Sequence, residues 1–245
     1  MSLKLLSVLV LIFVLSAIPF AHAQSIYTVQ VASPVWGTRT IGVNIQQNPK
    51  WAHDAVLTGM QEWNQAQAWF KETYYPQGKY YNLTASSTGP VTLTFHNYSS
   101  SSVYKGLTSP RVSDGEYTSM IVVIMLLNPN PAADELDYYS SVINHELGHV
   151  LGLGHAPSNE TDDLMCECLL STPPSTISTL DLYAAHIVAS GRVKVEQTIG
   201  LPSSIPYTYY VPNVPVPEFS SSPILVTCAV SALLLLSRKR RPRER

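Results

Sequence analysis

Two histidines four residues apart, followed by a third six residues later, constrain the fold of this chain more than any other feature. The segment reads His145-Glu-Leu-Gly-His149-Val-Leu-Gly152-Leu-Gly-His155. On a helix, positions four apart lie on one face, so His145 and His149 would direct their imidazoles toward the same point. The third histidine lies outside that helical register. The chain therefore has to turn back after the helix.

The spacing predicts a catalytic zinc site at this turn. Gly152 can take the left-handed conformation that ends a helix, which would bring His155 back toward the other two rings. Zinc in catalytic sites takes three protein ligands and leaves one position for water, whereas a structural site closes with a fourth side chain. We therefore expect His145, His149 and His155 to bind Zn²⁺ and Glu146, beside the first ligand, to act as general base.

The pattern H-E-x-x-H-x-x-G-x-x-H is the signature of the metzincin zinc metallopeptidases, and the chain resembles their matrixin-like branch over roughly residues 35–190. The resemblance implies one catalytic zinc ion and hydrolysis of peptide bonds. It also implies a methionine in a tight turn beneath the zinc, and Met165, ten residues after His155, is the candidate. The residues directly after Met165 depart from the usual turn sequence of the family.

A second metal is an open question at this stage. Calcium could bind Asp134, Asp137, Asp162 and Asp163, although acids in loops and first helical turns commonly face solvent. The well-spaced structural zinc and calcium loops of the animal matrixins are absent from the sequence.

The periodicity of apolar residues predicts an α+β fold with helices packed on a twisted sheet. Eight uninterrupted apolar residues at 120–127 suit a strand buried on both faces. The resemblance adds a metzincin-like zincin fold whose sheet is mostly parallel, with a long first helix, an active-site helix and a C-terminal helix. The expected elements are strands at 36–47, 91–95 and 120–127, and helices from Pro49 to about Thr73, at 134–151 and at 176–189.

The chain divides into four expected segments. Residues 1–23 read as a signal peptide with a basic start, an apolar run and an Ala-His-Ala cleavage site. Residues 24–200 form the metallopeptidase catalytic domain. Residues 201–223 form a Pro- and Ser-rich linker, and residues 224–245 hold a short hydrophobic segment with a basic tail.

The C-terminal segment predicts attachment to the cell surface. Its apolar run of thirteen residues, Ile224 to Leu236, would reach about 20 Å as a helix, short of a hydrocarbon core of about 30 Å. With Pro217-Glu218-Phe219 before it and arginines after it, it resembles the PEF-type sorting signal of archaeal surface proteins, which a sorting enzyme cuts. The alternative is a tail anchor with its basic residues in the cytoplasm. Both place a secreted body outside the cell, attached to membrane or cell wall.

The charge of the chain limits its possible binding partners, and its cysteine content limits its disulfides. Eight basic and sixteen acidic residues lie between the leader and the tail, which argues against nucleic acid as a partner. The three cysteines are too few for a disulfide framework. Cys166 and Cys168 could form a strained local disulfide, pair between chains or respond to redox state, and a disulfide is favoured because free thiols outside a cell tend to oxidise. Sequons at Asn82, Asn97 and Asn159 fit an exported protein.

Three functions are compatible with these features. The first is an endopeptidase that cleaves extracellular or cell-surface proteins and peptides. The second is a maturation protease with one dedicated target. The third is a surface module that keeps the fold without the chemistry, which would typically have lost the glutamate or a histidine, and this chain retains all of them.

Overall fold

The structure, a computed structural model, describes residues 27–32, 34–46, 49–97, 106–126, 128, 130–157, 163–166, 176–193 and 197–211. The expected leader at 1–23 and the apolar segment with its basic tail at 224–245 lie outside these residues. In the part of the chain so described, no helix combines the length and the apolar character needed to cross a membrane.

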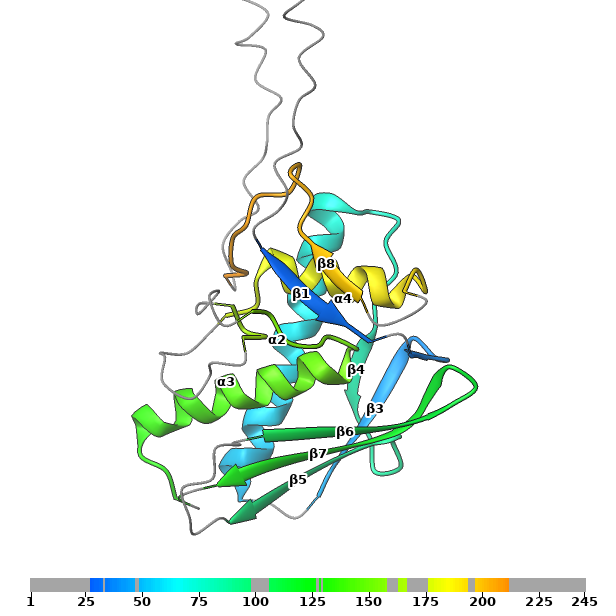
Figure 1. Ribbon diagram of the computed structural model, residues 1–245. Helices are drawn as coiled ribbons and strands as arrows, with labels where there is room; N and C mark the ends of the chain where they lie inside the picture. Colours follow the sequence, from blue (N-terminus) through cyan, green and yellow to red (C-terminus); the bar gives the residue numbers. More distant parts are fainter. Residues whose placement is uncertain are drawn as a thin grey trace, which may run out of the picture. The chain divides into compact units, whose positions relative to one another are not determined.

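A six-stranded sheet forms the base of the fold (Figure 1). All its pairings are parallel except the one between β6 and β7, so the expected mostly parallel sheet is confirmed. Its main path runs β2-β7-β5-β3-β4, and β6 pairs along β7. The strands are β2 (Val35–Trp36), β3 (Thr40–Ile45), β4 (Asn82–Ala85), β5 (Val91–Asn97), β6 (Gly106–Ser113) and β7 (Glu116–Leu126).

The antiparallel hairpin of β6 and β7 was not predicted, although the sequence carries a signal for it. Asp114 and Gly115 connect the two strands and both have positive φ, 53° and 79°. Such a two-residue Asp-Gly connection favours a tight hairpin because its twist matches that of the strands.

Strand β7 corrects the expectation that residues 120–127 form a strand buried on both faces. Ile121 of β7 is 44% exposed while Val122 is fully buried, so the strand is buried on one face only.

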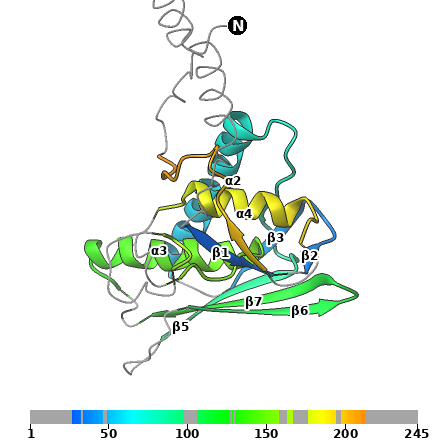
Figure 2. The ribbon, with the colours of Figure 1, turned by 45° about the horizontal axis from the view of Figure 1, so that its top comes forward.

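In the described ranges three helices pack on the sheet. Figure 2 shows them gathered on one side of it. Helix α2 (Lys50–Tyr74) buries an apolar stripe that follows the helical period, and each residue predicted for this face is buried. Helix α3 (Ala133–Val150) carries the first two histidines, and α4 (Thr179–Ala189) is shorter than the predicted 176–189. The buried stripe of α2 comprises Ala52, Val56, Met60, Trp63, Ala66 and Phe70.

A second, two-stranded sheet joins the two ends of the folded unit. Strand β1 (Thr28–Val31) pairs antiparallel with β8 (Gln197–Gly200), and neither strand was predicted. The chain after β8 continues to pack on the domain, because Leu201 and Ile205 are buried and the ring of Tyr207 stacks on Tyr27 at 3.9 Å. Residues 201–211, the first part of the expected linker, thus belong to the folded unit.

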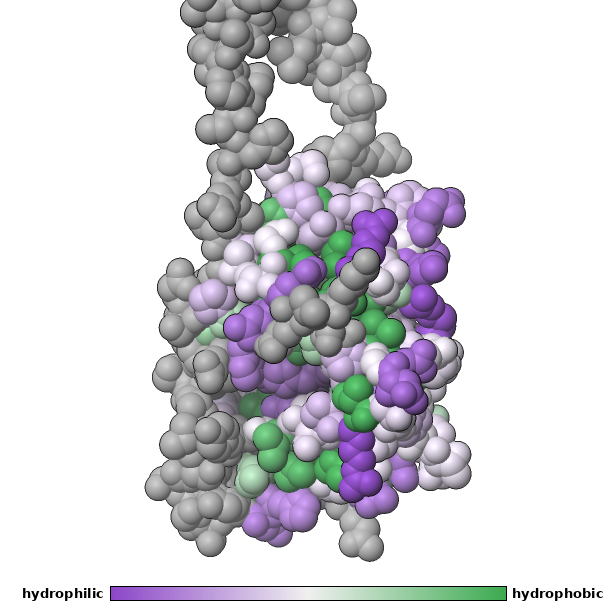
Figure 3. Space-filling model, turned by 45° about the vertical axis from the view of Figure 1, so that its right-hand side comes forward, coloured by the Kyte–Doolittle hydropathy of each residue, from purple (hydrophilic) through white to green (hydrophobic). Residues whose placement is uncertain are grey.

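The side of the molecule at which the β6–β7 hairpin turns is mixed in character. Figure 3, in which the right-hand side of Figure 1 comes forward, shows hydrophobic residues interspersed among hydrophilic ones. The large exposed apolar residues of these two strands are Leu107, Val112 and Ile121. The helices cover the opposite face, so the core and the histidines lie on that side of the sheet.

Candidate metal centre

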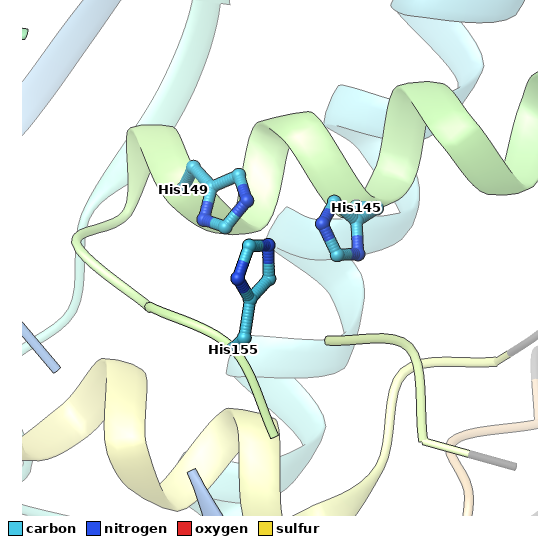
Figure 4. Close-up of side chains that lie close together, drawn as sticks. All are labelled: His145, His149 and His155. Atoms are coloured by element: carbon cyan, nitrogen blue, oxygen red, sulfur yellow. The ribbon is translucent and has the colours of Figure 1, made fainter. Parts of the chain in front are cut away.

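The three predicted histidines converge (Figure 4). Each offers one ring nitrogen, and these nitrogens lie within 4.8 Å of one another. His145 and His149 project from α3 toward His155, which follows the turn after the helix. Among the residues that the structure describes, this is the one group of three or more His, Cys, Asp or Glu side chains close enough to hold a metal ion.

The protonation of two rings suits metal binding. The Nδ1 atom of His145 lies 2.7 Å from the carbonyl oxygen of Leu164, and Nδ1 of His149 lies 2.8 Å from that of Leu153. A carbonyl only accepts hydrogen bonds, so each Nδ1 carries the proton and each Nε2 keeps its lone pair for a metal. Burial lowers the pKa of His145 to about 3 and that of His149 to about 4, which keeps both rings neutral. The donor set therefore fits a metal ion.

The turn that returns His155 to the site is built on Gly152. Its φ is +91°, a conformation that residues with a side chain rarely adopt. The Gly152 N–H donates to the carbonyl oxygen of His149 at 2.9 Å, and the Leu153 N–H donates to that of Gly148 at 3.1 Å. This pair of hydrogen bonds is a Schellman motif, which satisfies the last carbonyls of α3 and redirects the chain.

Strand β1 holds the third ligand in place through its backbone. The Gln30 N–H donates to the carbonyl oxygen of His155 at 3.0 Å, and the Gly154 N–H donates back to the Gln30 carbonyl at 2.7 Å. The Ala32 N–H donates to the Gly152 carbonyl at 3.0 Å. The segment that carries His155 is thus paired like a strand with residues near the start of the folded unit, a connection that no local pattern in the sequence indicates.

Helix α2 fixes the position of α3 at the first histidine. The Trp63 indole N–H donates to the Asn144 carbonyl at 3.0 Å, and the Asn144 side-chain amide donates to a Glu62 carboxylate oxygen at 2.7 Å. Trp63 is fully buried. Because Asn144 directly precedes His145, these contacts fix the backbone position from which the His145 side chain projects.

The general-base candidate lies between α3 and β6, where its carboxyl contacts Thr108 and Gly106. Glu146 is 4% exposed, and burial raises the pKa of its carboxyl to about 7, against a smaller lowering by the hydrogen bond from Thr108. The Thr108 hydroxyl lies 2.5 Å from Oε2 of Glu146. A carboxyl with a pKa near neutrality can both accept and return a proton at physiological pH.

Met165 lies fully buried against the same helix. A Cβ placed on Gly148 would overlap the Met165 sulfur, so the side chain fills the space that this glycine leaves. The Ala156 N–H donates to the Met165 carbonyl at 2.8 Å, which joins the methionine segment to the residue after His155. The carbonyl that orients His145 belongs to Leu164, the neighbour of Met165.

Two buried acids anchor the segment that contains Leu164 and Met165. The sequence did not single them out as a pair. Asp163 and Asp181 are both fully buried. One Asp163 oxygen accepts from the Met165 N–H at 3.0 Å, and the other accepts from the hydroxyls of Ser178 and Tyr207 at 2.9 and 3.1 Å. Burial, and then the nearby Asp163, raise the pKa of Asp181 well above its usual range. Asp163 therefore serves as a hydrogen-bond centre for the turn whose Leu164 carbonyl contacts His145.

The predicted calcium site falls partly outside the residues that the structure describes. Asp162 and the side chain of Asp134 lie outside them, so a calcium site that uses these acids stays a prediction. Cys166 is disulfide-bonded, and both other cysteines, Cys168 and Cys228, also lie outside the described part.

Comparison with known proteins adds no assignment. No protein-family model matches the chain, and no curated protein matches it either. The interpretation of the site therefore depends on its residues and their geometry.

Proposed function

We propose that this chain is a zinc-dependent endopeptidase of the metzincin type, matrixin-like branch, that hydrolyses peptide bonds of extracellular or cell-surface proteins. The observation that carries the proposal is the joint arrangement of the three histidines and Glu146. Three imidazole nitrogens within 4.8 Å of one another suit zinc, with one position left for water. The buried carboxyl of Glu146 follows the first ligand directly in the same helix.

Zinc at this site would supply a Lewis acid that activates water and polarises the scissile carbonyl. Glu146 would accept the proton of the attacking water and return it to the leaving amine. Burial raises the pKa of this carboxyl in the chain without metal, which favours the step in which Glu146 takes up a proton. The Leu164 and Leu153 carbonyls would keep the His145 and His149 rings in the tautomer that ligation needs.

The edge of the sheet at strand β6 favours a peptide as the substrate. Strand β6 pairs with β7, and no other pairing of β6 occurs in the described residues. An extended peptide can add itself to such an edge through backbone hydrogen bonds. Because Thr108 of β6 contacts Glu146, a peptide bound along this strand would lie next to the proposed base.

Secretion, attachment through the C-terminus and processing near Pro217–Phe219 belong to this proposal as well. They would place the enzyme where its substrates are other surface proteins. A maturation protease with one target uses the same site and differs only in the range of peptides that it cuts.

The test is cleavage of a quenched peptide library by the chain without its leader. We expect activity that a chelator abolishes and added zinc restores. Glu146→Ala should lose about 10²–10⁴-fold in activity while keeping its zinc, because it lacks the general base. Glu72→Ala, which removes an exposed glutamate from α2, is the matched control. A folded, zinc-loaded protein that cut no peptide, or a Glu146→Ala variant with most of its activity, would contradict the proposal.

A further inference from the structure

We propose that Thr108 is a positioning residue for the Glu146 carboxyl and that Gly106 provides the space in which this carboxyl lies. The inference rests on the proposed function, since it gives Glu146 a reason to be held in one orientation. Both residues belong to β6, far from the histidine motif in the sequence.

The register of the hairpin places both residues on the helix side of the sheet. Gly106 pairs with Ile124 and Thr108 pairs with Val122, and both partners are fully buried beneath the helices. Leu107, between them, is 52% exposed on the other face. Because side chains alternate along a strand, Thr108 has to point toward α3.

The two residues contact the two oxygens of the carboxyl. The Thr108 hydroxyl lies 2.5 Å from Oε2 of Glu146. A Cβ placed on Gly106 would overlap Oε1 and come 2.6 Å from the carboxyl carbon. Any side chain at position 106 would therefore displace the carboxyl from this place.

The hydrogen bond from Thr108 fixes the position of one carboxyl oxygen. A hydroxyl donates to a carboxylate oxygen, so Thr108 can hold Oε2 of Glu146 in place. Within the described chain, Thr108 is the one hydrogen-bond partner of the Glu146 side chain. Glu146 is 4% exposed, so without Thr108 its buried carboxyl would lose its hydrogen-bond partner among the described residues.

The experiment compares Thr108→Val, Thr108→Ser and Gly106→Ala with the wild-type chain, all loaded with zinc. Thr118→Val is the matched control, since it makes the same change on the exposed side of the hairpin, where the hydroxyl bonds the Arg111 carbonyl. We expect kcat to fall about 10- to 100-fold in Thr108→Val, because misplaced catalytic groups cost rates of this order. KM and zinc content should stay unchanged, and Thr108→Ser should restore most of kcat.

Crystal structures of the same variants provide a readout that does not depend on activity. The carboxyl should leave its place in Thr108→Val and Gly106→Ala and keep it in Thr108→Ser. A Thr108→Val variant with an unmoved carboxyl, or with kcat within about twofold of wild type, would overturn the inference. If the wild-type chain cuts no peptide, the proposed function fails, and the crystal structures alone then decide whether Thr108 holds Glu146.

Discussion

The packing of Met165 beneath the active-site helix leads to a quantitative prediction for Gly148→Ala. The added Cβ would overlap the sulfur of Met165 and lie 3.2 Å from its methyl carbon and 3.3 Å from the Trp63 ring. Met165 and Trp63 are both fully buried, so neither can move aside into solvent. The substitution must therefore strain the contact between α3 and the turn that holds Leu164 and Met165.

Two opposing contributions set the size of the effect. Overpacking a buried site typically costs about 1–3 kcal/mol of unfolding free energy. Replacing glycine by alanine inside a helix raises the unfolding free energy by about 1 kcal/mol. The net expectation for Gly148→Ala is a loss of about 0–2 kcal/mol, and each kcal/mol lowers Tm by about 2–4 °C in a domain of this size.

A double-mutant cycle separates the contact from other effects. Met165→Ala alone should cost about 2–5 kcal/mol through the cavity that it leaves. In the double variant the methyl group of residue 148 enters that cavity. The loss of unfolding free energy in the double variant should therefore be smaller than the sum of the two single losses by about 0.5–3 kcal/mol. The assay is urea unfolding in the presence of a chelator, because bound metal would add its own stabilisation. Additive losses, or a Gly148→Ala variant about 1 kcal/mol more stable than wild type, would refute the packing argument.

Three further predictions concern the metal centre and its support. In His155→Ala, added zinc should no longer raise Tm; a zinc-dependent rise equal to that of wild type would exclude this histidine as a ligand. Gln30→Pro, which removes the N–H bonded to the His155 carbonyl, should weaken zinc affinity about fivefold, equivalent to about 1 kcal/mol, in a competition titration, whereas unchanged affinity would show that β1 does not position the ligand. Because the pKa of Asp181 is raised in the folded state, the stability that its proton provides is present below about pH 3.8 and is lost as pH rises through the higher folded value. Asp181→Asn should therefore gain stability relative to wild type as pH rises, and parallel curves would refute a raised pKa of Asp181 in the folded state.

Local sequence determined the elements of the site better than their surroundings. The buried stripe of α2 was predicted because the helical period is a property of neighbouring residues. The convergence of the three histidines followed from a spacing of four on one helix and a glycine at its end. The Asp114-Gly115 signal for the hairpin was present but was not used, and with it the edge strand next to Glu146 was missed.

The tertiary structure alone decided what surrounds these elements. Strands β1 and β8 are short, and they are strands only because they pair with each other across most of the chain. Asp163 looked like a solvent-exposed loop acid, yet its hydrogen bonds to Ser178 and Tyr207 come from the C-terminal part of the folded unit. The contact of Thr108 with Glu146 depends on the register of a hairpin lying over a helix. Spacing within a helix is fixed by local geometry, whereas burial and pairing between distant segments are fixed only when the whole core has packed.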